Sequence, residues 1–269
     1  MIIESDDKMR CLIYQVAVGK PSKLYEHCID SVREYCSRYG ITHIVQNTPK
    51  MWIKPDPFTT NRSKEAVSRV GCLPIFEKEN AFDYLDDFDM IAIIDADVYV
   101  RPDADNIFLE PMQKNCAIAV ASERDMNIKP WYAEKIKNYS HMQYGLLHSN
   151  KVNFLPNHLG FEFFNMGVML INSKNFKPFL QGQTGKQFIQ RDEFKRFVDG
   201  EGAWKWSTDQ TLLNYFLKKY KVPTKKLRSK FNGLFTAVND IEDCDFVHFF
   251  LKDKLPERGE NVEELMKQI

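Results

Sequence analysis

The 269-residue sequence lacks an excess of charge of either sign and has no long hydrophobic run. Acidic and basic residues are balanced at 37 each, which argues against nucleic acid as the main partner, because phosphate binding needs a standing basic excess. No stretch reaches the length of about 18 apolar residues typical of a membrane span. Residues 1–8 (MIIESDDK) also lack the apolar core of a signal peptide. We therefore expect a soluble, cytoplasmic protein with no membrane span.

Cysteine pairs with metal-binding or redox spacing are also lacking. The six cysteines are scattered along the chain and form no CxxC pair. This usage suits a reducing compartment, and it predicts neither a disulfide framework nor a zinc site of the cysteine type. The sequence likewise contains no internal repeat and no low-complexity linker. One domain spanning residues 1–269 is therefore the expected organisation.

What the chain does contain is an alternation of apolar runs and amphipathic segments. A strand at 11–18, a helix at 24–39 and a strand at 41–46 form a βαβ unit, which indicates a parallel sheet. The remaining pattern predicts strands at 90–94, 117–121, 163–171 and 246–250, helices at 64–84, 208–220 and 257–269, an irregular loop at 52–61 and an inserted loop-and-helix segment at 129–156. The expected class is α/β, with a Rossmann-like, mostly parallel central sheet flanked by helices.

Two aspartates follow the most apolar predicted strand. Residues 90–94 (MIAII) lead directly into Asp95 and Asp97, whose spacing points both carboxylates to one side of the strand end. Open parallel sheets bind ligands at this edge. Neighbouring carboxylates repel each other unless a cation lies beside them, and Mg²⁺ or Mn²⁺ suits oxygen ligands. The pattern alone also fits a solvated acidic turn.

Four segments in order, within residues 11 to 255, resemble the GT-A glycosyltransferases, especially the glycogenin-like and galactosyltransferase-like branches. They are IAIIDAD (91–97), FNMGVMLIN (164–172), STDQTLLN (207–214) and HFFLKDK (248–254). The resemblance implies a GT-A fold and sugar transfer from a nucleotide sugar. Leu251 stands where the family usually has Gly, and Leu255 where it has Pro. We therefore expect the segment that holds the diphosphate to differ in shape.

The resemblance also implies a divalent metal cofactor, Mn²⁺ or Mg²⁺. Asp97 and His248 would ligate it, and Asp95 would bond the metal or the donor's ribose and sugar. Lys254 would bind the diphosphate, adding positive charge at the phosphates. The metal would neutralise charge that builds on the departing nucleoside diphosphate. Considered alone, His248 is typical of a core histidine in an apolar strand, and Lys254 six residues later favours the metal role.

Further donor contacts are expected in the first half of the chain. Ala17 and Val18, at the end of the first strand, would hold the base and ribose through their backbone, although any strand end has this appearance in a sequence. Arg69 would lie over the donor, with Lys64 as the alternative. Asn165 would contact the donor sugar. A UDP-sugar is the favoured donor, with GDP as the alternative nucleotide.

Asp209 lies at the start of a predicted helix within WKWSTDQ (204–210). A carboxylate there can simply stabilise the helix dipole, with Ser207 or Thr208 as the cap. However, Trp204 and Trp206 flank it, and exposed aromatic rings stack on sugar faces. We therefore expect Trp204, Trp206 and Gln210 to bind the acceptor. Asp209 would be the general base of an inverting transfer, or a sugar-orienting carboxylate in a retaining one.

The resemblance divides the domain by function. Residues 10–110 would form the nucleotide-sugar-binding half, 111–255 the acceptor-binding half, and 256–269 a C-terminal tail or helix. The partners would be a nucleotide sugar and an oligosaccharide or glycoprotein acceptor. Compact members without a membrane anchor occur in bacteria and large algal viruses, which suggests either as a source.

Two other classes of protein share parts of this pattern. A HAD-type phosphatase also places an aspartate pair after an apolar strand, but normally after the first strand, whereas 94 residues precede Asp95 here, and Tyr99 replaces the usual Thr or Val. A catalytically inactive nucleotide-sugar-binding module would keep the fold without turnover. The combination of Asp97, His248 and Lys254 argues against it.

Overall fold

A six-stranded sheet in the order β2-β1-β3-β8-β5-β9 runs through the molecule. The computed structural model describes the backbone of residues 9–55 and 61–269, so residues 1–8 and part of the loop predicted at 52–61 lie outside the described residues. The strands of this sheet are β1 (Cys11–Val16), β2 (Thr42–Gln46), β3 (Met90–Ile94), β5 (Ile118–Ser122), β8 (Phe164–Asn172) and β9 (Thr224–Lys226). Only β8 runs against its neighbours, which confirms a mostly parallel central sheet.

Two small sheets accompany the central one. The first has the order β10-β11-β4 and the second pairs β6 with β7. Their strands are β4 (Val98–Val100), β6 (Pro156–Asn157), β7 (Gly160–Phe161), β10 (Gly233–Leu234) and β11 (Phe246–His248). The first small sheet matters for function because β4 continues the chain directly after Asp97.

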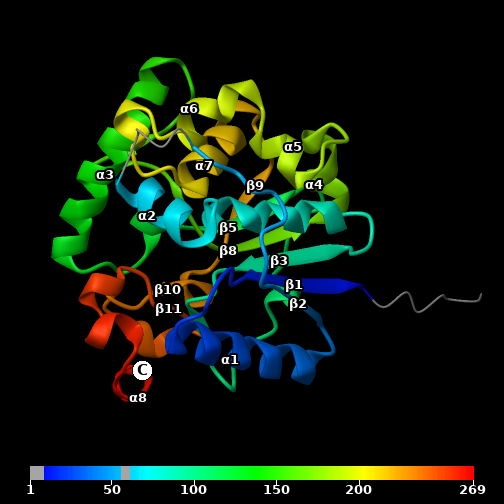
Figure 1. Ribbon diagram of the computed structural model, residues 1–269, viewed down its shortest axis with the longest axis vertical. Coiled ribbons are helices and arrows are strands. Elements are labelled where there is room, and N and C mark those ends of the chain that lie inside the picture. Colours follow the sequence, from blue (N-terminus) through cyan, green and yellow to red (C-terminus); the bar gives the residue numbers. More distant parts are fainter. Residues whose placement is uncertain (1–8, 56–60) are drawn as a thin grey trace, which may run out of the picture.

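Helices cover both faces of the central sheet (Figure 1). Helix α1 lies on one face, and α4, α5, α7 and the 3-10 helix η1 lie on the other. The helices are α1 (Lys23–Tyr39), α2 (Asn61–Val70), α3 (Pro130–Ser149), α4 (Ser173–Leu180), α5 (Gly185–Ile189), α6 (Lys195–Val198), α7 (Asp209–Lys219) and α8 (Val262–Met266). The 3-10 helices are η1 (Pro74–Tyr84), η2 (Ile107–Leu109), η3 (Glu123–Asp125), η4 (Asp192–Phe194), η5 (Gly202–Trp204), η6 (Ser229–Phe231), η7 (Ile241–Asp243), η8 (Lys252–Lys254) and η9 (Pro256–Gly259).

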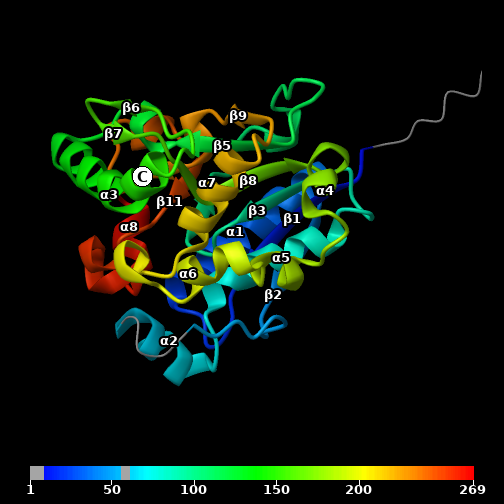
Figure 2. The same ribbon diagram turned by 90° about the horizontal axis from the view of Figure 1, so that it is seen from above.

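Helices α2, α3 and α8 gather beyond the carboxyl ends of the parallel strands. They lie on the left of both Figure 1 and Figure 2, opposite the end at which the chain enters β1. Ligands of open parallel sheets bind at this edge. Among the described residues, no helix combines the length and apolar composition needed to cross a bilayer.

The first helix begins and ends where its sequence predicts. The side chain of Ser22 accepts a hydrogen bond from the backbone N–H of Tyr25, and so caps the helix. Gly40 ends it in the left-handed region, with φ 64°, which costs a glycine little. The buried stripe that includes Leu24, Cys28 and Val32 packs toward the core, in agreement with the amphipathic pattern.

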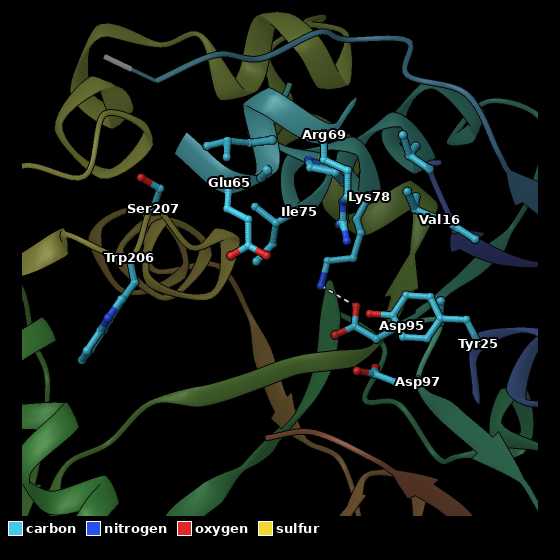
Figure 3. A pocket seen from close by; sticks show the side chains of 16 residues that line it. Val16, Tyr25, Glu65, Arg69, Ile75, Lys78, Asp95, Asp97, Trp206 and Ser207 are labelled. Atoms are coloured by element: carbon cyan, nitrogen blue, oxygen red, sulfur yellow. Dashed lines mark hydrogen bonds and ion pairs between the residues drawn. The ribbon is translucent and has the colours of Figure 1, made fainter. Parts of the chain in front are cut away.

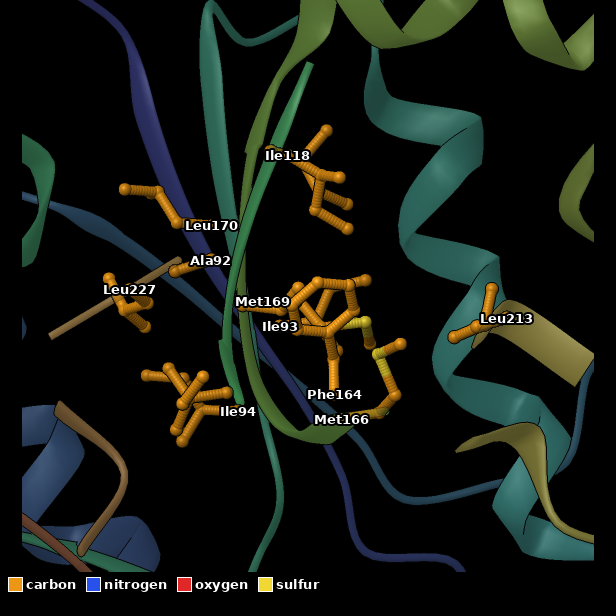
Figure 4. Packing of buried hydrophobic residues seen from close by; sticks show 14 of the residues in the cluster. Ala92, Ile93, Ile94, Ile118, Phe164, Met166, Met169, Leu170, Leu213 and Leu227 are labelled. Atoms are coloured by element: carbon orange, nitrogen blue, oxygen red, sulfur yellow. The ribbon is translucent and has the colours of Figure 1, made fainter. Parts of the chain in front are cut away.

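The centre of the core lies between β3 and β8. All five residues of β3 are buried, which confirms the prediction of a strand covered on both faces. Ala92 pairs with Leu170 on one face, and Ile93 pairs with Met169 on the other (Figure 4). Full burial of such aliphatic side chains stabilises a fold by about 1.5–3 kcal/mol each. The rigid strand they form is what holds Asp95 in place.

The prediction of one helix over residues 64–84 is wrong. Helix α2 ends at Val70, and Gly71 adopts a φ of 80°, which an α-helix cannot continue through. Pro74 then starts the 3-10 helix η1. Its buried Glu77 accepts hydrogen bonds from the backbone N–H groups of Lys50, Met51 and Trp52. This contact draws η1 against the core, a tertiary effect that helical periodicity does not reveal.

Two further segments differ from their predictions. The C-terminal segment 257–269 is α-helical only over Val262–Met266, because Glu257 and Arg258 both have positive φ. The predicted strand at 246–250 ends at His248, and Leu251 lies in the left-handed region with φ 58°. The helices α4, α5 and α6 lie between the strand predicted at 163–171 and the helix predicted at 208–220, where the sequence pattern predicts no element.

Candidate active site

Three side chains converge just beyond the ends of β3 and β11. The ligand atoms of Asp95, Asp97 and His248 all lie within 4.8 Å of one another. Nε2 of His248 is 3.3 Å from Oδ1 of Asp97 and 3.8 Å from Oδ2 of Asp95. Two carboxylates and an imidazole are a donor set that suits Mn²⁺, and Mg²⁺ if oxygen ligands dominate. The structure thus brings together the three residues predicted as metal ligands.

Strand register explains how Asp97 and His248, which are far apart in the sequence, meet. The backbone N–H of Asp95 donates to the carbonyl of Gly167 at 2.8 Å, which ties the end of β3 to β8. After Asp97 the chain turns into β4, which pairs antiparallel with β11 so that Val98 lies opposite His248. The N–H of Phe249 also donates to the carbonyl of Asp97 at 2.8 Å. His248 is therefore held beside the two aspartates by backbone pairing.

A buried lysine, Lys78 of η1, balances the charge at this site. Its Nζ lies 2.7 Å from Oδ1 of Asp95 (Figure 3). The same Nζ lies 2.7 Å from Oδ2 of Asp209 and donates to the carbonyl of Met166 at 3.1 Å. The side chains of Lys78 and Asp209 are only 8% and 3% exposed. Burial by itself would lower the pKa of Lys78. The carboxylates of Asp209 and Asp95 raise it by more, so the pKa lies above its ordinary value. The lysine therefore stays charged.

The three candidate ligands have shifted pKa values. Burial raises the pKa of Asp95, and Lys78 opposes only part of this effect. Burial acts the same way on Asp97, but the neighbouring His248 outweighs it and leaves the pKa below the usual range. For His248, burial lowers the pKa while Asp97 and Asp95 raise it above its ordinary value. The carboxylates of Asp95 and Asp97 therefore favour a positive charge beside them, either on the imidazole of His248 or on a bound cation.

Two pockets meet at Asp95 and Asp97. The first, of about 380 Å³, extends to the end of β1 and to α2, and the second, of about 700 Å³, extends toward α3, α7 and the segment after β11. Both are lined by Tyr25, Ile75, Lys78, Asp95, Asp97 and Trp206. Figure 3 shows the first pocket with the two aspartates at its floor and Trp206 at the far side. The two pockets are therefore adjacent and share the two aspartates as part of their lining.

Most of the predicted donor residues line these pockets. Ala17, Val18 and Arg69 line the first pocket, whereas the alternative, Lys64, does not. Asn165 lines the second. Its side-chain amide is already engaged, because Nδ2 donates to Glu123 at 2.8 Å and Oδ1 accepts from the N–H of Gly167 at 2.9 Å.

Only some of the predicted acceptor residues line the pockets. Asp209 and Gln210 line the second pocket, and Trp206 borders both. The half-buried Trp206 stacks on Tyr139 with ring centroids 5.6 Å apart and an interplanar angle of 16°. Thr208, one of the two predicted caps, caps α7. Asp209 is the first residue of α7, where its charge can stabilise the helix dipole, and its carboxylate also faces Lys78.

Trp204 and Lys254 lie away from both pockets. Trp204 is 6% exposed, and its indole N–H donates to the carbonyl of Gln143 at 2.9 Å. The expectation of an exposed aromatic is therefore wrong for Trp204, because the short 3-10 helix η5 turns the ring into the core. Lys254 is exposed and its Nζ lies 4.3 Å from the ring centroid of Trp131.

Several site residues were not predicted. Lys252 lines the second pocket and its Nζ lies 3.9 Å from the ring centroid of Tyr25, so the lysine at the site is the one two residues before Lys254. Lys252 lies within the HFFLKDK segment, which is a usable sequence signal. Lys78 and the buried Glu123 carried no such signal. A single charged residue beside a strand or in a helical stretch is usually on the surface, and the sequence does not show that these two are buried at the site.

Gly167 gives a test of the metal-ligand arrangement. A Cβ at this position would lie 2.5 Å from Nδ1 of His248 and 3.0 Å from Oδ1 of Asn165. We expect Gly167→Ala to displace the imidazole and weaken Mn²⁺ binding roughly 10-fold or more, measured by calorimetric titration. Gly145→Ala is the matched control, because its Cβ would meet only Phe161, at 3.6 Å. Unchanged Mn²⁺ affinity in Gly167→Ala would remove His248 from the metal site.

Comparison with known proteins identifies the fold. No protein-family model matches the sequence, and no curated protein matches it at a significant level. Solved structures do match. A glycosyltransferase involved in the glycosylation of the major capsid of PBCV-1 is 14% identical over 95% of this chain and 99% of that one, with a TM-score of 0.53. Mouse xyloside xylosyltransferase 1 is 12% identical over 92% and 100%, with a TM-score of 0.52.

A third match is the galactosyltransferase LgtC, solved in complex with donor and acceptor sugar analogues. It is 14% identical over 96% of this chain and 94% of that one, with a TM-score of 0.51. Identities this low establish a shared fold. The protein therefore has the GT-A glycosyltransferase fold in a single domain, as its four sequence segments predicted.

Proposed function

We propose that this protein is a divalent-metal-dependent glycosyltransferase. It moves a sugar from a nucleoside-diphosphate sugar, with UDP favoured, to a hydroxyl of an oligosaccharide or glycoprotein acceptor. The observation that carries the proposal is the position of Asp95, Asp97 and His248 where two pockets meet. A transferase needs such an arrangement because donor and acceptor must reach one centre from two sides. One structure with the same fold holds both kinds of sugar analogue.

The first pocket is the donor side of this proposal. Ala17, Val18 and Arg69 would hold the nucleoside there, and the diphosphate would lie over the aspartates. Asp95, Asp97 and His248 would hold Mn²⁺ or Mg²⁺, which as a Lewis acid neutralises charge on the leaving diphosphate. Lys252 lines the site on the same side as Tyr25. We assign it to the diphosphate, with Lys254 joining it only if the segment after β11 moves.

The second pocket is the acceptor side. Trp206, stacked on Tyr139, presents an aromatic surface of the kind on which sugar rings pack, and Gln210 adds a polar side chain beside it. Asp209 lines this pocket while Lys78 holds its Oδ2. Its carboxylate would orient the transferred sugar or accept the proton of the acceptor hydroxyl.

Ligand-induced stabilisation tests the proposal, with Asp97→Asn as the variant. At UDP and Mn²⁺ concentrations of about 100 times Kd, binding stabilises the fold by about 2.7 kcal/mol, or roughly 5–10 °C in Tm for a chain of this size. We expect this shift in the wild type and its loss in Asp97→Asn, because the carboxylate is a metal ligand. Asp199→Asn, an aspartate paired with Lys195 outside the two pockets, should behave as the wild type.

The outcomes of this experiment separate the alternatives. No stabilisation by any nucleoside diphosphate with Mn²⁺ or Mg²⁺ would contradict both the enzyme and the binding module. Stabilisation without hydrolysis or transfer of any nucleotide sugar would indicate an inactive binding module. Turnover of p-nitrophenyl phosphate would indicate the phosphatase, although β1 here ends at Val16, the apolar residues 17 and 18 follow it, and the aspartate pair comes after β3.

A further inference from the structure

Behind the candidate metal ligands lies a buried chain of polar side chains that the proposed function does not use. Nδ1 of His248 is 3.0 Å from Oδ1 of Asn232, and Nδ2 of Asn232 donates to Oδ1 of Asn165 at 2.9 Å. Nδ2 of Asn165 donates to Oε1 of Glu123 at 2.8 Å, and the hydroxyl of Tyr132 donates to Oε2 at 2.5 Å. All five residues are at most 6% exposed.

The direction of this chain is fixed at one end by a backbone group. The N–H of Gly167 lies 2.9 Å from one of the two terminal atoms of the Asn165 side-chain amide. A backbone N–H can only donate a hydrogen bond. That atom must therefore be the oxygen, Oδ1, of Asn165. Its other side-chain atom is then the NH₂ group, which suits the acceptor-only carboxylate of Glu123.

The same logic passes to Asn232. The atom of Asn232 that faces Oδ1 of Asn165 must be its NH₂ group, because two amide oxygens 2.9 Å apart would repel each other. The remaining atom, Oδ1, faces the imidazole of His248 and can only accept. Nδ1 of His248 must therefore carry a hydrogen. In the neutral ring this leaves the lone pair on Nε2, the atom that faces Asp95 and Asp97.

We propose that Asn232 is a positioning residue that holds neutral His248 in the Nδ1–H tautomer, with its orientation set through Asn165 by Glu123. The inference rests on the proposed function only in that Nε2 is taken to face a divalent cation. Histidine ligands generally donate their second N–H to a fixed acceptor, and loss of that acceptor weakens metal binding about 10–100-fold. An amide oxygen in this place orients the ring without adding a further charge beside the carboxylates of Asp95 and Asp97.

These hydrogen-bonded side chains also link parts of the fold that are distant in sequence. Asn232 lies between η6 and β10, Asn165 lies on β8, and Glu123 starts η3. None of these three residues is a candidate metal ligand. Asn165 and Glu123 also line the second pocket, whereas Asn232 lines neither pocket and acts on the site only through its neighbours. A purely structural role would change stability and leave the tautomer of His248 unchanged.

Nitrogen-15 NMR of histidine in the metal-free protein tests the inference directly. At a pH where His248 is neutral, we expect the wild type to show Nδ1 protonated and Nε2 unprotonated, with the signal assigned by its absence in His248→Gln. Asn232→Leu should shift the ring toward Nε2–H and weaken Mn²⁺ binding about 10–100-fold. Asn232→Asp keeps an acceptor oxygen and should retain the Nδ1–H tautomer.

Asn80→Ala is the matched control. Asn80 is also a buried asparagine, and it donates to Gln46 and Glu77 outside the chain described here, so its loss should leave the tautomer and Mn²⁺ affinity unchanged. A wild-type protein in the Nε2–H form would overturn the inference, as would an unchanged tautomer in Asn232→Leu. If Asn232→Leu does not fold, the inference is tested by the tautomer of His248 in the wild type and in Asn232→Asp, both of which should be in the Nδ1–H form. Failure of the wild type to bind Mn²⁺ would instead contradict the proposed function.

Discussion

Asp209→Asn is expected to lower the rate of sugar transfer by about 10²–10⁴-fold, the usual contribution of a catalytic carboxylate. The substitution keeps the size of the side chain, and its amide oxygen can still accept a hydrogen bond from Lys78. It removes the negative charge that lies between Lys78 and the second pocket. Because Asp209 is not one of the three candidate metal ligands, binding of UDP with Mn²⁺ should be retained.

Two measurements separate these effects. Calorimetric titration with UDP and Mn²⁺ reports donor binding, and release of nucleoside diphosphate in the presence of an acceptor reports transfer. Asp199→Asn serves again as the control, because it neutralises a largely buried aspartate away from the site. Full transfer activity in Asp209→Asn would remove Asp209 from the mechanism, whereas equal loss of donor binding would give it a role in shaping the site.

Lys78→Met is expected to lower the free energy of unfolding by about 3–5 kcal/mol near neutral pH, because it leaves buried carboxylates without their partner. Lys78 is the shared counter-charge of Asp95 and Asp209, at 2.7 Å from each. The loss should shrink as the pH falls, since burial raises the pKa of Asp95 and protonation of its carboxylate removes uncompensated charge. It should also shrink with excess Mn²⁺, which supplies a cation beside Asp95. Urea denaturation under the three conditions measures each effect.

A surface lysine provides the comparison for this variant. Lys267 pairs with Glu263 at 2.9 Å, but the side chains are 62% and 84% exposed, so Lys267→Met should change the stability by less than about 0.5 kcal/mol. Adding Asp209→Asn to Lys78→Met should restore part of the lost stability, because it removes one of the unpaired charges. A Lys78→Met protein as stable as the wild type would contradict the assignment of Lys78 as the shared counter-charge.

Much of the site could be predicted because its residues lie within contiguous segments. Asp95 and Asp97 follow a strand of five buried residues, and His248 ends another short strand. The end of a strand is a local feature. An apolar run followed by acidic residues predicts carboxylates at a strand end, whichever position the strand takes in the sheet. The same applies to α1, whose cap, apolar stripe and terminal Gly40 are all read from neighbouring residues.

The errors arose where one local pattern fits two environments. Trp204 and Trp206 are two residues apart, yet one lies in the core and the other at the pockets. Lys252 and Lys254 are also two residues apart, but Lys252 lines the second pocket whereas Lys254 is exposed outside both pockets. Which side chain of such a pair turns inward depends on short 3-10 turns and on residues with positive φ, for which an apolar or charged pattern gives no signal.

The sequence by itself determined the α/β class, the positions of the longer strands along the chain, the aspartate pair as candidate metal ligands and the segments that resemble GT-A glycosyltransferases, because each depends on residues close together in the chain. His248 joined the candidate ligands through that resemblance. Only the tertiary structure decided that Lys78 balances Asp95 and Asp209, and that Asn232 faces His248. These contacts join η1 to α7 and the end of η6 to β11. Their energies come from burial and short distance, and neither exists until the segments have packed together.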